Sequence, residues 1–123
     1  MKVGDYVRLD RYQGIRKIDD YDEEIKEYFL DGDIYDEWGD LTLKLEKYDV
    51  VKFSPNIIDL IEVGDYVNGY KVSFVDEEPV LGKFVQCDYA VQYGTTNHYR
   101  FYEREIKSIV TKEQFAIMEY KVN

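Results

Sequence analysis

The chain is poor in the residues that build disulfide-linked or metal-linked scaffolds. Its 123 residues include one cysteine, one histidine and two prolines. A single cysteine, Cys87, excludes an internal disulfide framework and is typical of a reducing compartment. Met1-Lys2-Val3-Gly4-Asp5 lacks an apolar signal core, and no apolar run approaches membrane-spanning length. We therefore expect a cytoplasmic protein without a membrane partner.

Basic residues are also scarce, with 16 Lys and Arg against 26 Asp and Glu. The formal net charge of −10 argues against direct binding to nucleic acid, because such binding depends on cations that neutralise phosphates. Aromatic residues, in contrast, are abundant, with thirteen tyrosines in a chain that is 45% hydrophobic. Tyrosine favours strands and contact surfaces, and this composition argues against global disorder.

A five-residue motif occurs twice, as Val3-Gly4-Asp5-Tyr6-Val7 and Val63-Gly64-Asp65-Tyr66-Val67. A second pair of similar segments, residues 50–54 and 107–111, follows in the same order. Two such pairs indicate a tandem repeat of about 60 residues. Each repeat is at the lower limit for independent folding, so we expect the two copies to share an interface.

Alternating apolar residues and turn residues predict that each repeat is a mainly β unit of five short strands. In the first repeat we expect a hairpin that turns at Asp31-Gly32 and a strand through Leu41, Leu43 and Leu45. A helical turn capped by serine is expected at Ser54-Pro55, and a strand is expected to follow it at residues 59–63. In the second we expect strands at 67–75, 80–93 and 98–110, a turn at 94–97, and a capping box at 111–114. One helical turn before the last strand is the plan of a small SH3-like barrel. The predicted domains are therefore two tandem SH3-like barrels, residues 1–61 and 62–123.

The net charge is concentrated in one segment, residues 19–40, which holds eleven acids and one base, Lys26. Like charges on one hairpin repel one another, and a cationic partner would compensate for that repulsion. Carboxylates that alternate with aromatic rings imitate the phosphates and bases of a nucleic acid, so we expect this hairpin to bind a protein groove built for DNA or RNA. The alternative is a solvated hairpin that keeps the protein soluble and protects a sheet edge. The predicted partner-binding residues are Asp19, Asp20, Asp22, Glu23, Glu24, Glu27, Asp31, Asp33, Tyr35, Asp36, Glu37 and Trp38.

Enzyme and cofactor motifs are missing from the sequence. It contains no glycine-rich phosphate loop, no histidine relay around Ser or Cys, and no nucleophile elbow, so we expect a non-enzymatic protein without a cofactor. The run from Asp31 to Asp36 has a tyrosine where a calcium loop needs an oxygen ligand. Cys87 and His98 are eleven residues apart, and a zinc site there would need carboxylates to complete it.

Two segments of the chain resemble known families. Val3-Gly4-Asp5-Tyr6-Val7 followed by residues 14–18 resembles the leading strands of bacterial SH3-like modules of the Tudor and KOW type, including those that bind RNA polymerase, although Arg16 replaces the usual second glycine. Residues 54–72 and 109–115 resemble small phage and prophage proteins of Gram-positive bacteria. That second resemblance implies no activity, but it implies a context in which small acidic phage proteins, anti-CRISPR proteins among them, disarm host machinery.

Two functions follow as hypotheses. The first is an anti-CRISPR inhibitor whose acidic, aromatic hairpin occupies the basic channel of a type II effector nuclease, or of another nucleic-acid-binding protein, and blocks DNA access. The second is an SH3-like adaptor that binds host RNA polymerase or a virion protein.

Overall fold

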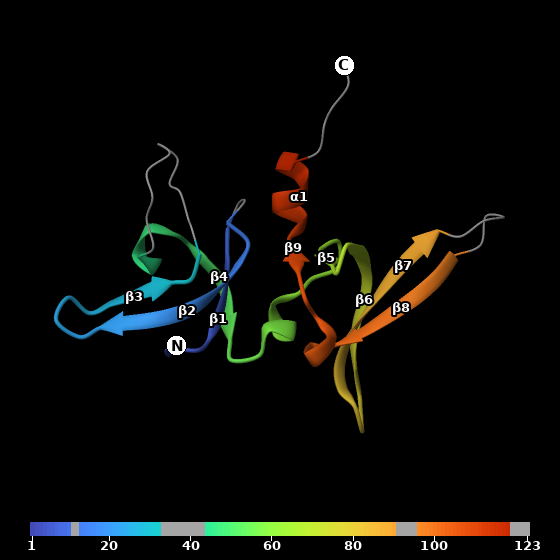
Figure 1. Ribbon diagram of the computed structural model, residues 1–123, viewed down its shortest axis with the longest axis horizontal. Helices are drawn as coiled ribbons and strands as arrows, with labels where there is room; N and C mark the ends of the chain where they lie inside the picture. Colours follow the sequence, from blue (N-terminus) through green and yellow to red (C-terminus); the bar gives the residue numbers. More distant parts are fainter. Residues whose placement is uncertain (11–12, 33–43, 91–95, 119–123) are drawn as a thin grey trace, which may run out of the picture. The chain divides into compact units, whose positions relative to one another are not determined.

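The computed structural model describes residues 1–10, 13–32, 44–90 and 96–118. The chain divides into two compact units, Met1–Leu60 and Ile61–Asn123. Both units are mainly β, each with one antiparallel sheet (Figure 1). The expected mainly β class is therefore confirmed, while no closed barrel is found in the part of the chain that the structure describes.

The first unit contains a sheet with the strand order β3-β2-β1-β4. Its core is built from Val7, Leu9, Ile18, Leu30 and Leu45, which are all buried. The elements, in chain order, are β1 (Tyr6–Leu9), β2 (Ile15–Asp22), β3 (Glu27–Leu30), the 3₁₀ helix η1 (Leu45–Lys47), β4 (Val50–Ser54) and the 3₁₀ helix η2 (Ile57–Leu60).

The second unit contains a sheet with the strand order β8-β7-β6-β5-β9. Its buried apolar residues include Val67, Val72, Val85 and Cys87. The elements are β5 (Tyr66–Val67), β6 (Tyr70–Glu78), β7 (Gly82–Ala90), β8 (Thr96–Tyr102), the 3₁₀ helix η4 (Glu103–Glu105), β9 (Ile109–Val110) and the helix α1 (Lys112–Met118).

The repeated motif forms the same tight turn in both units. Asp5 N donates to Lys2 O at 3.1 Å, and Asp65 N donates to Glu62 O at 3.1 Å. The third residue of each turn is a glycine with positive φ, 96° at Gly4 and 99° at Gly64. This is the geometry of a type II turn, which favours glycine at that position because a Cβ atom would strain the left-handed backbone.

The aspartate that ends each turn is buried, 3% exposed at Asp5 and 0% at Asp65. Its Oδ2 accepts the backbone N–H that begins the turn, from Lys2 at 3.0 Å and from Glu62 at 2.7 Å. Its carbonyl oxygen accepts an N–H from the next strand, from Ile18 in the first unit and from Val72 in the second, both at 2.7 Å. Each aspartate therefore holds its turn against the second strand of its unit.

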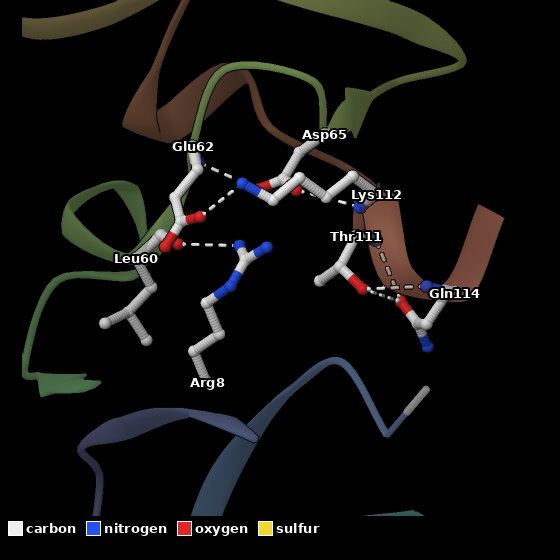
Figure 2. Close-up of polar contacts among 7 residues, drawn as sticks. All are labelled: Arg8, Leu60, Glu62, Asp65, Thr111, Lys112 and Gln114. Carbon is white, nitrogen blue, oxygen red and sulfur yellow. Dashed lines mark hydrogen bonds and ion pairs between the residues drawn. The ribbon is translucent and has the colours of Figure 1, made fainter. Parts of the chain in front are cut away.

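The two aspartates differ in their other carboxylate oxygen. Asp65 Oδ1 accepts the N–H of Lys112 at 2.9 Å, at the first residue of α1 (Figure 2). Asp5 Oδ1 is buried and has no hydrogen-bond partner among the described residues. In the first unit the chain after the last strand enters η2 instead, and Asn56 N donates to Ser54 Oγ at 3.1 Å.

Some expected elements are corrected. Leu45 lies in η1 and not in a strand, while Leu41 and Leu43 lie outside the described residues. Residues 59–63 do not resume as a strand, because Asp59 and Leu60 belong to η2 and the motif turn follows. Thr96 and Asn97 belong to β8, where they pair with Ala90 and Tyr89. The predicted capping box is confirmed: Gln114 N donates to Thr111 Oγ1 at 3.2 Å, and Thr111 N donates to Gln114 Oε1 at 2.9 Å.

The difference between the two aspartates yields the first testable prediction. In Asp65→Asn one amide N–H must face a backbone donor, so we expect a loss of about 1–3 kcal/mol in the free energy of unfolding. In Asp5→Asn the NH₂ group can take the position of the unpartnered Oδ1, so we expect a change below about 0.5 kcal/mol, or a gain. Urea denaturation of both variants measures the difference. An Asp5→Asn cost equal to that of Asp65→Asn would contradict this difference between the two turns.

Candidate binding surface

The described part of the acidic segment, residues 19–32, lies mostly in the hairpin β2–β3, whose turn is at residues 23–26 (Figure 1). Asp31-Gly32 forms a bend after β3, and Gly32 has a positive φ of 71°, but the strand expected after it lies outside the described residues, so that second hairpin stays a prediction. Asp31 lies beyond β3 at the base of the hairpin, where its Oδ1 accepts Lys17 N at 2.9 Å and its own N–H donates to Lys17 O at 3.0 Å. These two bonds extend the pairing of β2 and β3 as far as Asp31.

The structure places six of the predicted partner-binding acids along the hairpin arm. Three are on β2, two are in the turn, and the sixth begins β3: Asp19, Asp20, Asp22, Glu23, Glu24 and Glu27. Asp31 is separate, at the base. Asp33, Tyr35, Asp36, Glu37 and Trp38 lie outside the described residues.

Two of these acids on β2 shape the local backbone. Asp22 Oδ1 accepts Glu24 N at 2.9 Å, with Ile25 N at 3.4 Å, and so closes the turn. Asp20 Oδ1 accepts Tyr21 N at 2.8 Å. The Asp22 bond is common for aspartate in turns. Both side chains therefore have a structural role as well as a charge.

Three other acids, Asp19, Glu23 and Glu24, are exposed, and their side chains make no hydrogen bond or ion pair with the described part of the chain. Asp22 lies opposite Glu27 in the register of the hairpin, which places two like charges across from one another. Like charges directly opposite on a sheet destabilise it. The charges of Asp19, Glu23 and Glu24 therefore add no hydrogen bond or ion pair to the described part of the fold.

An aromatic pair accompanies the acids. Tyr21 and Tyr28 are cross-strand partners whose ring centroids are 4.6 Å apart at an interplanar angle of 44°. Tyr28 Oη donates to Met1 O at 2.9 Å, which fixes that ring, while Tyr21 is 36% exposed. An exposed ring beside carboxylates is the combination that the sequence predicted for this hairpin.

The clustered titratable residues of the second unit have a structural role. Glu62, Asp65 and Lys112 lie together near the start of α1 (Figure 2), and Lys112 Nζ contacts Glu62 Oε1 at 2.8 Å. The hydrogen bond with Glu62 raises the pKa of Lys112. Asp65 uses both oxygens on backbone N–H groups, so this cluster caps the start of α1.

Buried Arg8 is a residue that sequence reasoning missed. A strand residue between buried Val7 and Leu9 normally faces solvent, but Arg8 is 1% exposed. Its Nη1 donates to Leu60 O at 2.9 Å (Figure 2). A buried guanidinium costs several kcal/mol if its partners are removed, so Arg8 ties β1 to η2. No feature of the sequence pattern distinguishes it from an exposed arginine.

Three rings of the second unit, Tyr70, Tyr99 and Phe101, also cluster. Their centroids are 4.8, 6.1 and 6.2 Å apart. These separations are those of rings in direct contact, so the three side chains pack against one another.

Comparisons with known proteins identify no relative. No protein-family model, curated protein or solved structure matches the chain. Within the described ranges, no three His, Cys, Asp or Glu side chains come together as a metal site. The helices in those ranges are too short or too polar to cross a membrane.

Cys87 provides the second testable prediction. Its thiol is 0% exposed, and burial, with a smaller contribution from Asp88, raises its pKa from 9.0 to about 11. We expect no reaction with a disulfide reagent such as DTNB at pH 8 in the folded protein and rapid reaction after denaturation. Between pH 9 and 11 the unfolded thiol loses its proton while the folded thiol keeps it, so stability should fall over this window.

The control for this prediction is Cys87→Val, which keeps an apolar side chain in the core. Its loss of stability between pH 9 and 11 should be smaller than that of the wild type. Fast modification of the folded wild type at pH 8 would show that Cys87 is an accessible nucleophile.

Proposed function

We propose that the protein is a non-enzymatic inhibitor that occupies the basic nucleic-acid channel of a host defence nuclease through the β2–β3 hairpin. The observation that carries the proposal is the line of carboxylates on this arm, most of them exposed, combined with the exposed ring of Tyr21. The partner is a protein, and nucleic acid competes with the hairpin for the same groove.

The charge density of the arm supports the proposal. Residues 19–24 hold five carboxylates. At about 3.3 Å per residue they span at most about 17 Å, so one charge occurs about every 4 Å. One strand of DNA carries a phosphate about every 3.4 Å along the helix axis. A groove lined with Lys and Arg for a nucleic-acid backbone therefore meets a similar linear charge on this hairpin.

The energetics also favour a cationic partner. Exposed carboxylates that repel one another destabilise a compact unit. Beside a basic surface the same carboxylates are attracted to its cations, which offsets that repulsion. Solubility alone does not require the acids to lie on one arm. The concentration of charge on a two-stranded projection favours recognition over general solvation.

The proposed target is an RNA-guided effector nuclease of the type II, single-protein class. Such proteins hold nucleic-acid backbones in positively charged channels. The resemblance of residues 54–72 to phage and prophage proteins of Gram-positive bacteria supports this choice, since these phages meet such nucleases in the host cytoplasm. The protein would then be an anti-CRISPR protein.

We also propose that both units are SH3-like. The second unit has the order β8-β7-β6-β5-β9 with the 3₁₀ helix η4 before its last strand, which is the strand plan expected of an SH3-like barrel. The first unit has β3-β2-β1-β4 with η1 before its last strand. This plan supports the second candidate function, an SH3-like adaptor for host RNA polymerase or a virion protein.

A charge reversal tests the proposed function. Glu23→Lys/Glu24→Lys changes two exposed tip residues whose side chains make no hydrogen bond or ion pair with the described chain. The assay measures inhibition of DNA cleavage by a Cas9-type nuclease–guide RNA complex from a Gram-positive bacterium. We expect the wild type to inhibit, and the variant to need at least about tenfold more protein, because each lost ion pair becomes a repulsion.

The matched control is Glu46→Lys/Asp49→Lys, which alters net charge equally at two exposed residues outside the hairpin. It should inhibit as the wild type does. Equal loss in both variants would mean that only net charge matters. Inhibition by neither the wild type nor the control would overturn the proposed target class and direct attention to the adaptor function.

A further inference from the structure

We propose that the tip of the β6–β7 hairpin is a second partner-binding element, which inserts into a small apolar pocket ringed by Lys or Arg on the same nuclease. This inference rests on the proposed function and deepens it. The tip consists of Pro79, Val80 and Leu81, between the last residue of β6 and the first residue of β7.

The register shows that this hairpin is the counterpart of β2–β3. Tyr6 pairs with Lys17 in the first unit, and Tyr66 pairs with Lys71 in the second. Both hairpins then have a bulge one residue further, between Ile18 and Asp20 and between Val72 and Phe74. Lys17 therefore corresponds to Lys71, 54 positions later in the chain. The residues on either side of the two bulges are also 54 positions apart.

This correspondence aligns two acidic triplets. Counted from the paired lysines, residues 22–24 correspond to residues 76–78, and both read Asp-Glu-Glu. An aliphatic residue follows each triplet at the tip, Ile25 in the first unit and, after Pro79, Val80 in the second. The two units thus present the same combination, three acids and then an exposed aliphatic side chain, on the same hairpin.

The second tip is the more apolar and the more exposed. Val80 is 90% exposed and Leu81 is 57% exposed, against 50% for Ile25. Towards the tip, the pairing of β7 with β8 ends at Phe84 and Tyr102. The pairing of β6 with β7 continues beyond that point, as far as Glu78 and Gly82. The tip therefore projects beyond the three-stranded part of the sheet, where neighbouring strands cannot cover it (Figure 1).

Side chains of β8 hold the end of β6 next to the tip. Arg100 Nη1 contacts Glu78 Oε1 at 2.9 Å, and Tyr102 Oη donates to Glu78 Oε2 at 3.0 Å. The Arg100 guanidinium also lies 4.5 Å from the ring centroid of buried Phe84. A pre-organised loop loses little conformational freedom when it binds, so a small apolar tip can contribute usefully to affinity.

The charges around the tip indicate the chemistry of its partner. Glu78 forms an ion pair with Arg100, and Lys83 lies opposite Glu77 in the register, while Asp76 and Glu77 are exposed behind the tip. A pocket that accepts Val80 and Leu81 would therefore be flanked by two carboxylates, and basic residues at its rim would complement them. A partner with a basic channel, as proposed for the first hairpin, offers that rim.

The test compares the Val80→Ser/Leu81→Ser variant with the wild type on the same nuclease–guide RNA complex, by binding kinetics. We expect at least about a tenfold faster dissociation, because buried anchors act mainly on the dissociation rate. Added salt should leave this apolar contribution nearly unchanged, whereas it should reduce the contribution of Glu23 and Glu24. The control is Val51→Ser/Val63→Ser, which makes the same kind of change at two valines outside the tip that are 56% and 57% exposed. This variant should bind as the wild type does.

The outcomes separate the two proposals. Unchanged dissociation of Val80→Ser/Leu81→Ser, with weakened binding of Glu23→Lys/Glu24→Lys, overturns this inference and leaves the proposed function intact. No binding by the wild type overturns both. A smaller sedimenting mass for Val80→Ser/Leu81→Ser than for the wild type, without a change in nuclease binding, would overturn it too and assign the tip to contact between copies of this chain.

Discussion

The turn that carries the Val-Gly-Asp motif fixes the start of each sheet. A positive φ at Gly4 and Gly64 lets the chain reverse, and a buried aspartate, Asp5 or Asp65, then bonds to the first residue of the turn. Because its carbonyl accepts an N–H from the second strand, the turn also sets the register of that strand. The strand continues into a projecting hairpin, so the acids of both arms are placed by the turn at their base.

The two units use this common frame differently. In the second unit the second carboxylate oxygen of Asp65 receives the start of α1, which adds a helix with its own capping box. In the first unit Asp5 lacks that partner among the described residues and η2 follows. The hairpins diverge as well: the first is richer in carboxylates, and the second ends in Val80 and Leu81. Under the proposed function, one arm supplies electrostatic attraction and the other an apolar anchor.

Parts of the structure follow from local sequence chemistry, and these are the parts that could be predicted. The glycine turns, the mainly β class and the Thr111–Gln114 capping box depend on residues adjacent in the chain. The burial of Arg8 and the 3₁₀ helix at Leu45 depend on contacts distant in sequence, which alternation does not encode. The pairing of Asp31 with Lys17 also joins residues 14 positions apart, which local composition does not encode. The acidic composition of the candidate surface could likewise be predicted, because the acids are close together in the sequence. The position of the hairpin tip at residues 23–26 could not, because it follows from the strand register. The matching triplet at residues 76–78 is 54 positions from the first, while the motif turns are 60 apart, so a search at one fixed period misses it.

Competition between the protein and nucleic acid for one basic groove is what the proposed function requires. Equilibrium titration measures it: the labelled protein is added to the Cas9-type nuclease–guide RNA complex at increasing concentrations of target DNA. We expect the apparent dissociation constant to rise in proportion to the DNA concentration. An affinity that stays the same in saturating DNA would show that the hairpin does not occupy the nucleic-acid channel.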